Sequence, residues 1–199
     1  MTDIRTSETH PIYADFVPAD ALGLPGRLGM TFAPGMKAPS YKGFLWERGV
    51  DADLRELRES FGTDVLVSLM EDFEYADDHY GLGGVKGFGS AVEAAGIEFR
   101  PFPIRDMNIP RPERNDEYAE FIAGIIASLE NGETVVAHCR AGVGRTGTVV
   151  ASVLIGLGHD PERAIAIVRE ARSPRMLEAI SQEEYVREFA KGYGGRWKR

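Results

Sequence analysis

The chain has 199 residues, of which 43% are hydrophobic and 27% are charged, so it can form one globular domain with a sizeable core. Its formal net charge of −8 argues against a nucleic-acid-binding surface. No apolar run approaches the roughly 18 residues of a membrane span, the N-terminus lacks a signal-peptide pattern, and the single cysteine cannot form an intramolecular disulfide. We therefore expect a reduced, cytoplasmic protein that binds neither nucleic acid nor membrane.

The first third of the chain alternates apolar runs with loops rich in glycine and proline. Residues 1–26 lack periodicity and predict an irregular arm. Residues 27–33 alternate apolar with small or polar side chains, which predicts a short, edge-like strand. A loop containing Trp46 leads to residues 51–61, where leucines at helical spacing follow a candidate aspartate cap. Residues 64–70 are almost continuously apolar, which is typical of a strand covered on both faces.

The rest of the chain alternates predicted helices with strands. Helices are predicted over 85–96, 116–132, 146–158, 160–172 and 181–192, and strands over 97–104 and 134–138. Asp160 is the expected cap of one helix, and Ser181 with Glu184 forms a candidate capping box for the last. This alternation implies an α/β fold with a central, mainly parallel sheet flanked by helices. We expect a single domain over 27–193, followed by a basic tail (194–199) that frays.

The stretch TVVAHCRAGVGRTGT (134–148) places Cys139 between a buried strand and a core helix. Such turns, at the carboxyl ends of parallel strands, usually bind ligands in α/β proteins. Gly142 and Gly144 let the turn curl so that backbone N–H groups and the helix N-terminus face one spot, which favours an anion and stabilises a thiolate. Arg145 adds a planar guanidinium that binds two phosphate oxygens. The pattern predicts a cysteine nucleophile within a phosphate site.

Two other interpretations of Cys139 carry less weight. Free cysteine is often a small buried hydrophobe, but that role does not explain the two glycines and the arginine that follow. A tetrahedral zinc site lacks ligands, because His138 is adjacent while the other histidines lie at positions 10, 79 and 159. We expect no metal and no cofactor. The cluster Asp77, Asp78 and His79 is interpreted as a solvated loop.

The order His-Cys, five residues, Arg, Thr in HCRAGVGRTG resembles the signature of the cysteine-dependent protein tyrosine phosphatase superfamily. That superfamily carries a general acid on an upstream loop, an Asp followed by Pro. Asp106 lies 33 residues before Cys139 and is followed by Pro110, although Arg105 precedes it where better-known loops have Pro or Trp-Pro. This spacing, with LPG, FAPG and ISQEEYVREF, resembles dual-specificity phosphatases similar to the cyclin-dependent kinase-associated phosphatase. The resemblance covers roughly residues 22–191.

The resemblance implies a dual-specificity phosphatase-like fold, a catalytic domain over 27–193 and a two-step mechanism without a metal. Cys139 would be the nucleophile that forms a cysteinyl phosphate, and Asp106 the general acid and then base. Thr146 would donate its hydroxyl to the departing thiolate, and His138 would orient the loop. The expected phosphate-binding residues are Arg140, Ala141, Gly142, Val143, Gly144 and Arg145.

The sequence allows more than one class of substrate. The leading interpretation is a protein phosphatase for phosphotyrosine in a phosphorylated protein or peptide, with phosphoserine and phosphothreonine as further substrates if the pocket is shallow. The alternative is a phosphoinositide or inositol phosphate phosphatase, although Ala141 and Val143 stand where phosphoinositide enzymes of the superfamily tend to carry lysine. A phosphate-binding module without turnover and a rhodanese-like sulfur carrier are disfavoured. The sequence contains a candidate nucleophile (Cys139), an arginine that clamps the phosphate (Arg145) and a candidate general acid (Asp106).

Other polar residues near the two loops have open roles. Gln182 lies where the related group has a glutamine that can position water, and Glu178 replaces the earlier glutamine of the tyrosine-specific pattern. Three nearby acidic residues are alternatives to Asp106: Glu113, Asp116 and Glu117. The loop that carries Asp106, residues 105–115, is called the acid loop below. Three arginines surround Asp106 there and either recruit an anionic substrate or are solvated: Arg105, Arg111 and Arg114.

Overall fold

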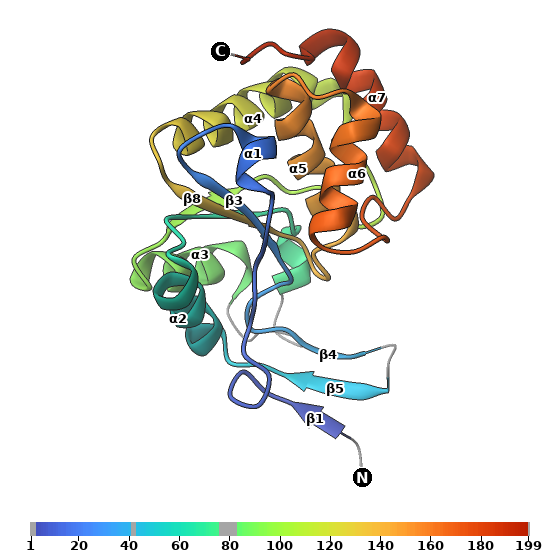
Figure 1. Cartoon of the computed structure of the whole chain (residues 1–199). Coiled ribbons are helices and arrows are strands. Elements are labelled where there is room, and N and C mark those ends of the chain that lie inside the picture. Colours follow the sequence, from blue (N-terminus) through green and yellow to red (C-terminus); the bar gives the residue numbers. More distant parts are fainter. Residues whose placement is uncertain (1–2, 41–42, 76–82, 199) are drawn as a thin grey trace.

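The computed structural model describes residues 3–40, 43–75 and 83–198. Its centre is a five-stranded sheet with the strand order β2-β3-β8-β6-β7. The neighbouring strands β3 and β8 are labelled in Figure 1. All neighbouring strands pair in parallel except β2, which is antiparallel to β3. The predicted α/β fold with a mainly parallel sheet is therefore confirmed. The strands are β2 (Asp15–Phe16), β3 (Arg27–Thr31), β6 (Val65–Ser68), β7 (Glu98–Pro101) and β8 (Thr134–His138).

Helices cover both faces of this sheet (Figure 1). Alternate residues of β8 point to opposite faces, so Val135 and Ala137 join one hydrophobic cluster and Val136 joins the other. The first cluster packs against α4, α5, α6 and α7, and the second against α2 and α3. The helices are α2 (Val50–Phe61), α3 (Gly84–Ala94), α4 (Asn115–Glu130), α5 (Gly144–Gly156), α6 (Pro161–Ala171) and α7 (Ile180–Tyr193).

Helix α5 lies in the core, as its uniformly apolar sequence predicts. Every residue from Gly144 to Gly156 is buried. The helix begins two residues before the predicted start at residue 146, so Arg145 and Thr146 belong to its first turn. The N-terminal turn of the helix therefore forms part of the cysteine loop itself.

The prediction of an irregular arm over 1–26 is wrong in part. The arm contains β1 (Asp3–Arg5), β2 and the helical turn α1 (Ala19–Leu22). Because β2 pairs with β3, strand β3 is not an edge strand as expected. Residues around Trp46, expected as a loop, form β5 (Phe44–Glu47), which joins β1 and β4 (Lys37–Pro39) in a second, three-stranded sheet. The domain boundaries at residues 27 and 193 stay predictions.

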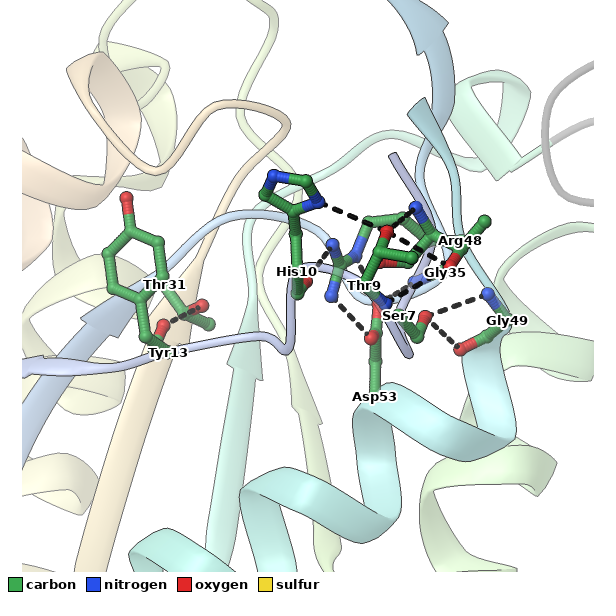
Figure 2. Close-up of polar contacts among 10 residues, drawn as sticks. Ser7, Thr9, His10, Tyr13, Thr31, Gly35, Arg48, Gly49 and Asp53 are labelled. Atoms are coloured by element: carbon green, nitrogen blue, oxygen red, sulfur yellow. Dashed lines mark hydrogen bonds and ion pairs between the residues drawn. The ribbon is translucent and has the colours of Figure 1, made fainter. Parts of the chain in front are cut away.

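A buried ion pair holds the arm against the body (Figure 2). The side chains of Arg48 and Asp53 are fully buried, with Nη2 to Oδ1 at 2.7 Å and Nε to Oδ2 at 2.8 Å. Arg48 Nη1 also donates to the carbonyl of His10, and Asp53 Oδ2 accepts from the N–H of Gly35. Each charge is thus satisfied by several hydrogen bonds, which a buried pair requires. The pair connects the arm and the FAPG loop to α2.

The structure confirms the predicted N-terminal cap of α6 but not those of α2 and α7. Asp160 accepts the N–H of Glu162 at 3.0 Å, so the expected cap of α6 is confirmed. The predicted aspartate cap of α2 is wrong, because the helix begins after Gly49. The Ser181–Glu184 capping box is also wrong, because α7 begins at Ile180 and the side-chain carbonyl of Gln182 accepts the N–H of Ala179.

The C-terminal tail packs on the body, so the expectation that it frays is wrong through residue 198. The N–H of Trp197 donates to the carbonyl of Gly156 at 3.1 Å, and its ring stacks on Tyr193. Gly156 has no side chain, which allows the indole to lie against α5. In the described ranges no helix is long and apolar enough to cross a membrane. The cluster at 77–79 lies outside the described residues.

Candidate active site

The cysteine loop connects β8 to α5 and requires glycine at position 142. Gly142 has a φ of +69°, which L side chains rarely adopt. A Cβ atom there would lie 2.0 Å from the carbonyl oxygen of Thr31 at the end of β3. Cys139 stands at the start of this turn with an exposed fraction of 3%. The local sequence therefore folds the loop tightly around its cysteine.

Three carbonyl groups of the loop are held from outside. The N–H of Ala33 donates to the carbonyl of Arg140 at 3.0 Å. The Arg172 guanidinium donates to the carbonyls of Ala141 and Gly142, at 3.3 and 2.7 Å. Because C=O and N–H of a trans peptide point in opposite directions, the N–H groups of the three following residues face the loop interior. These N–H groups and the first turn of α5 form a cradle for an anion.

Arg172 is a structural residue that sequence reasoning missed. Besides the two loop carbonyls, it pairs with Asp15 at 2.7 Å and donates to the carbonyl of Met30 at 3.1 Å. It therefore ties the cysteine loop to β2 and β3. Arg172 follows directly after an ordinary amphipathic helix, where arginine is common. Nothing in a single sequence therefore indicates that it binds the cysteine loop.

Arg145 occupies the centre of the site and is 1% exposed. Its Nη1 and Nη2 atoms bind the two carboxylate oxygens of Glu74 at 2.6 and 3.0 Å, and Nη1 donates to the carbonyl of Ile104 at 3.1 Å. Burial opposes the charge, but the Glu74 hydrogen bonds and the negative charges of Cys139, Glu74 and Asp106 raise the pKa of Arg145 above its ordinary value. The guanidinium therefore stays protonated and is fixed in orientation.

Glu74 is the second residue that the sequence did not single out. It lies in the short 3₁₀ helix η1 (Asp72–Tyr75), within a segment interpreted as an acidic loop. Only 9% of Glu74 is exposed, and its Oε2 also accepts the N–H of Glu71. Neighbouring acidic residues have the same local pattern, so only the fold distinguishes the carboxylate that holds Arg145.

Asp106 contacts Arg145 at the end of the cysteine loop, in agreement with the position that the family resemblance implies. Its Oδ1 atom lies 2.9 Å from Nη2 of Arg145 and accepts the N–H of Met107 at 3.0 Å. Its side chain is 58% exposed, so it lies at the mouth of the site. Two alternative acids bind elsewhere: Glu117 pairs with Arg114, and Asp116 accepts the hydroxyl of Tyr193.

Gln182 supports the acid loop from α7. The side chain is fully buried, and its Nε2 donates to the carbonyl of Asn108 at 3.2 Å while its Oε1 accepts from Ala179. A Cβ atom on Gly144 would lie within 3.0 Å of the Gln182 amide, so this amide also lies against the cysteine loop. Gln182 thus connects the two loops of the site.

Thr146 and His138 are both fully buried. Among the buried side-chain atoms of the described residues, Thr146 Oγ1 has no hydrogen-bond partner, which leaves its hydroxyl free to donate to a sulfur. His138 Nδ1 lies 3.1 Å from the carbonyl of Cys139. Burial lowers the pKa of His138 to about 4, opposed by that hydrogen bond and reinforced by the charge of Arg145. The ring is therefore neutral at pH 7, with Nδ1–H donating to the loop.

The low pKa of His138 makes stability depend on pH. Between the ordinary value of 6.5 and about 4, the unfolded chain binds a proton that the folded chain does not. The free energy of unfolding should therefore fall as pH is lowered through this window, by up to about 3 kcal/mol from this group. His138→Asn keeps an N–H donor and removes the titration. The free energy of unfolding of each protein is measured by urea titration at several pH values. The difference in this free energy between wild type and variant should shrink toward pH 4. An equal pH dependence in the two proteins would contradict the low pKa of His138.

The described residues hold no group of three or more His, Cys, Asp or Glu placed to bind a metal ion. The predicted residues that do come together are the cysteine loop, Asp106, Thr146 and His138. With the clamp Arg145 fixed by Glu74, they form an anion site with a thiol at its base and a carboxylate at its mouth.

Comparison with known proteins agrees with this geometry. Residues 35–159 match the family described as "Polymorphic toxin system, DSP-PTPase phosphatase". Cyclin-dependent kinase inhibitor 3 of Rattus norvegicus is 27% identical over 186 residues, 92% of this chain and 80% of that protein. An uncharacterized protein of Methanocaldococcus jannaschii, MJECL20, is 40% identical over 89 residues; the match spans 45% of this chain and 57% of that protein.

Solved structures share the fold. The kinase associated phosphatase, crystallised with its catalytic-site cysteine replaced by serine, has a TM-score of 0.78 and 23% identity, with 92% of this chain and 96% of that chain covered. PTPMT1 in complex with PI(5)P has a TM-score of 0.61 and 20% identity, with 83% and 91% covered. The family match extends over more than half of the chain. The chain therefore belongs to the DSP-PTPase family, and it is a cysteine-dependent phosphatase of the protein tyrosine and dual-specificity type.

Proposed function

We propose that the protein hydrolyses phosphate monoesters on proteins, with phosphotyrosine as the leading substrate, through a cysteinyl-phosphate intermediate. The observation that carries this proposal is the position of Asp106, 2.9 Å from the buried Arg145 at the mouth of the cysteine loop. The acid Asp106 and the nucleophile Cys139 then both lie close enough to the clamp Arg145 to influence its charge. A module that only bound phosphate would not need the acid.

In the first step, the thiolate of Cys139 attacks phosphorus and the S–P bond forms while the P–O bond to the leaving group breaks. Asp106, protonated, gives its proton to the leaving oxygen. Bound phosphate competes with the Asp106 carboxylate for Arg145 Nη2, which frees Asp106 to face the leaving group. Arg145 and the loop N–H groups bind the equatorial oxygens and stabilise the transition state most strongly.

In the second step, water attacks the cysteinyl phosphate and Asp106, now a carboxylate, takes a proton from that water. The S–P bond breaks and the thiolate of Cys139 is restored. The unpaired hydroxyl of Thr146 supports a role in donating a hydrogen bond to the departing sulfur. His138 supports the loop through its neutral ring and does not transfer protons in this scheme.

The proposal is tested with Asp106→Asn, which keeps the side-chain shape but cannot act as acid or base. Turnover of a phosphotyrosine peptide should fall about 10²- to 10³-fold, and peptide affinity should stay nearly unchanged. Mass spectrometry after acid quench of wild type should find one phosphoryl group on the peptide that contains Cys139. An unchanged rate in the variant would exclude Asp106 as the acid.

The substrate class is tested by a panel at equal concentrations. Phosphotyrosine peptide, phosphothreonine peptide and soluble inositol phosphates share the reacting group and differ in the depth at which it is presented. We expect the highest kcat/KM for phosphotyrosine. Preferred hydrolysis of an inositol phosphate would favour the alternative function, for which Ala141 and Val143 provide no cation in the loop.

A further inference from the structure

A cavity of about 480 Å³ lies beside the candidate active site. Its lining includes Arg105, Arg111 and Arg114, together with Ile104, Asn108 and a single carboxylate, Glu71. The volume is within the range of pockets that hold small ligands. Three guanidinium groups therefore gather around one hollow in a chain whose net charge is −8.

Two of these three arginines are available for a ligand. Arg114 pairs with Glu117 at 2.8 Å and lies over the ring of Phe102. Within residues 3–40, 43–75 and 83–198, neither Arg105 nor Arg111 forms an ion pair, and both are exposed. Glu71 cancels one of the positive charges. The cavity thus keeps a net positive charge and two guanidinium groups without a carboxylate partner.

The cavity and the active site share one wall, the acid loop. The carbonyl of Ile104 accepts a hydrogen bond from Arg145 at 3.1 Å, and the carbonyl of Asn108 accepts one from Gln182 at 3.2 Å. Between them, Asp106 turns toward Arg145 while its neighbour Arg105 lines the cavity. A substrate whose phosphate lies on Arg145 therefore places adjacent groups next to this cavity.

We propose that the cavity binds an acidic side chain flanking the phosphorylated residue of a peptide substrate, with Arg105 and Arg111 as the recognising groups. This specificity rests on the proposed phosphatase function. Guanidinium groups bind carboxylates through paired hydrogen bonds, and their charge attracts an acidic segment to an otherwise acidic molecule. The two arginines lie on the acid loop, outside the cysteine loop. An extended peptide carries its flanking charges many bonds away from its phosphate, whereas the groups of an inositol ring lie close to theirs. Arginines outside the cysteine loop therefore fit a peptide better than an inositol phosphate.

The test compares kcat/KM for three substrates: p-nitrophenyl phosphate, a phosphotyrosine peptide with neutral flanks, and the same peptide with aspartate or glutamate on both sides. Wild type should prefer the acidic peptide about tenfold, and higher NaCl should weaken that preference. Arg111→Gln and Arg105→Gln should each lower kcat/KM for the acidic peptide about three- to tenfold through KM. Values for the other two substrates should stay within about twofold. Arg163→Gln, an exposed arginine at the start of α6, is the matched control.

The outcomes separate this proposal from the proposed function. Turnover of p-nitrophenyl phosphate with equal kcat/KM for the two peptides would overturn the acidic specificity alone. No turnover of any substrate would overturn the phosphatase function. Equal losses on all three substrates would show that the arginines act on the catalytic centre and not on a flanking group. Inositol bisphosphate is measured as a fourth substrate. A loss of kcat/KM in Arg111→Gln that is seen only with this substrate would assign the cavity to a second phosphate and overturn the proposal of an acidic peptide side chain.

Discussion

Cys139→Ser should reduce turnover of p-nitrophenyl phosphate by at least about 10⁴-fold while leaving inorganic phosphate binding nearly unchanged. A serine hydroxyl is not ionised at neutral pH, so the variant lacks a nucleophile. The anion cradle does not depend on the sulfur, because its N–H groups are directed by Ala33 and Arg172 through the loop carbonyls. Calorimetric titration with phosphate measures the binding, and phosphate release measures the rate.

The pair of measurements separates chemistry from folding. Weak phosphate binding together with lost activity would mean that Cys139 maintains the loop and need not be the nucleophile. Residual activity above about one per cent of wild type would contradict covalent catalysis by this residue. Retained binding with lost turnover is the expected result, and the variant is then suited to holding phosphopeptide substrates for structural work.

Arg145→Lys should lower kcat about 10³-fold. The guanidinium binds both oxygens of Glu74 and also contacts Asp106, so it is held as a planar fork that can present two donors to phosphate. A lysine retains the charge but offers a point donor, and it cannot make both Glu74 contacts with the same geometry. The stabilisation that is lost acts mainly in the transition state, so kcat should fall more than phosphate affinity.

Thermal unfolding shows whether the lysine variant folds, because Glu74 would otherwise be left in a poorly paired, buried position. Arg163→Lys, in an exposed ion pair on α6, should leave both kcat and stability within error of wild type. A fall in kcat below about tenfold in a folded Arg145→Lys protein would show that charge alone suffices. The inference that phosphate recognition requires the planar guanidinium would then be wrong.

The sequence by itself was sufficient wherever the determinants are contiguous. The strand 134–138, the glycine turn and the apolar helix after it are neighbours along the chain, so local conformation places Cys139, Arg145 and Thr146 together. Helical periodicity also predicted α4 and α6 within a few residues. Asp106 was identified from spacing and family resemblance, and the fold brings it to Arg145 across 39 positions of sequence.

Only the tertiary structure decided which polar residues support the site. Glu74 and Arg172 each bind a loop group at least 30 positions away along the chain, and such contacts leave no period or cap in a single sequence. Gln182 was a candidate from the family resemblance, but its contact with Asn108 is visible only in the fold. The pairing of β2 with β3 and the buried Arg48–Asp53 pair likewise depend on partners that meet only after folding. Local sequence encodes the nucleophile and its anion cradle because these need only backbone geometry. The orientation of the clamp Arg145 requires side chains from several elements to converge. The arginines of the neighbouring cavity come from one short segment, and the fold decides only that Arg114 is paired with Glu117.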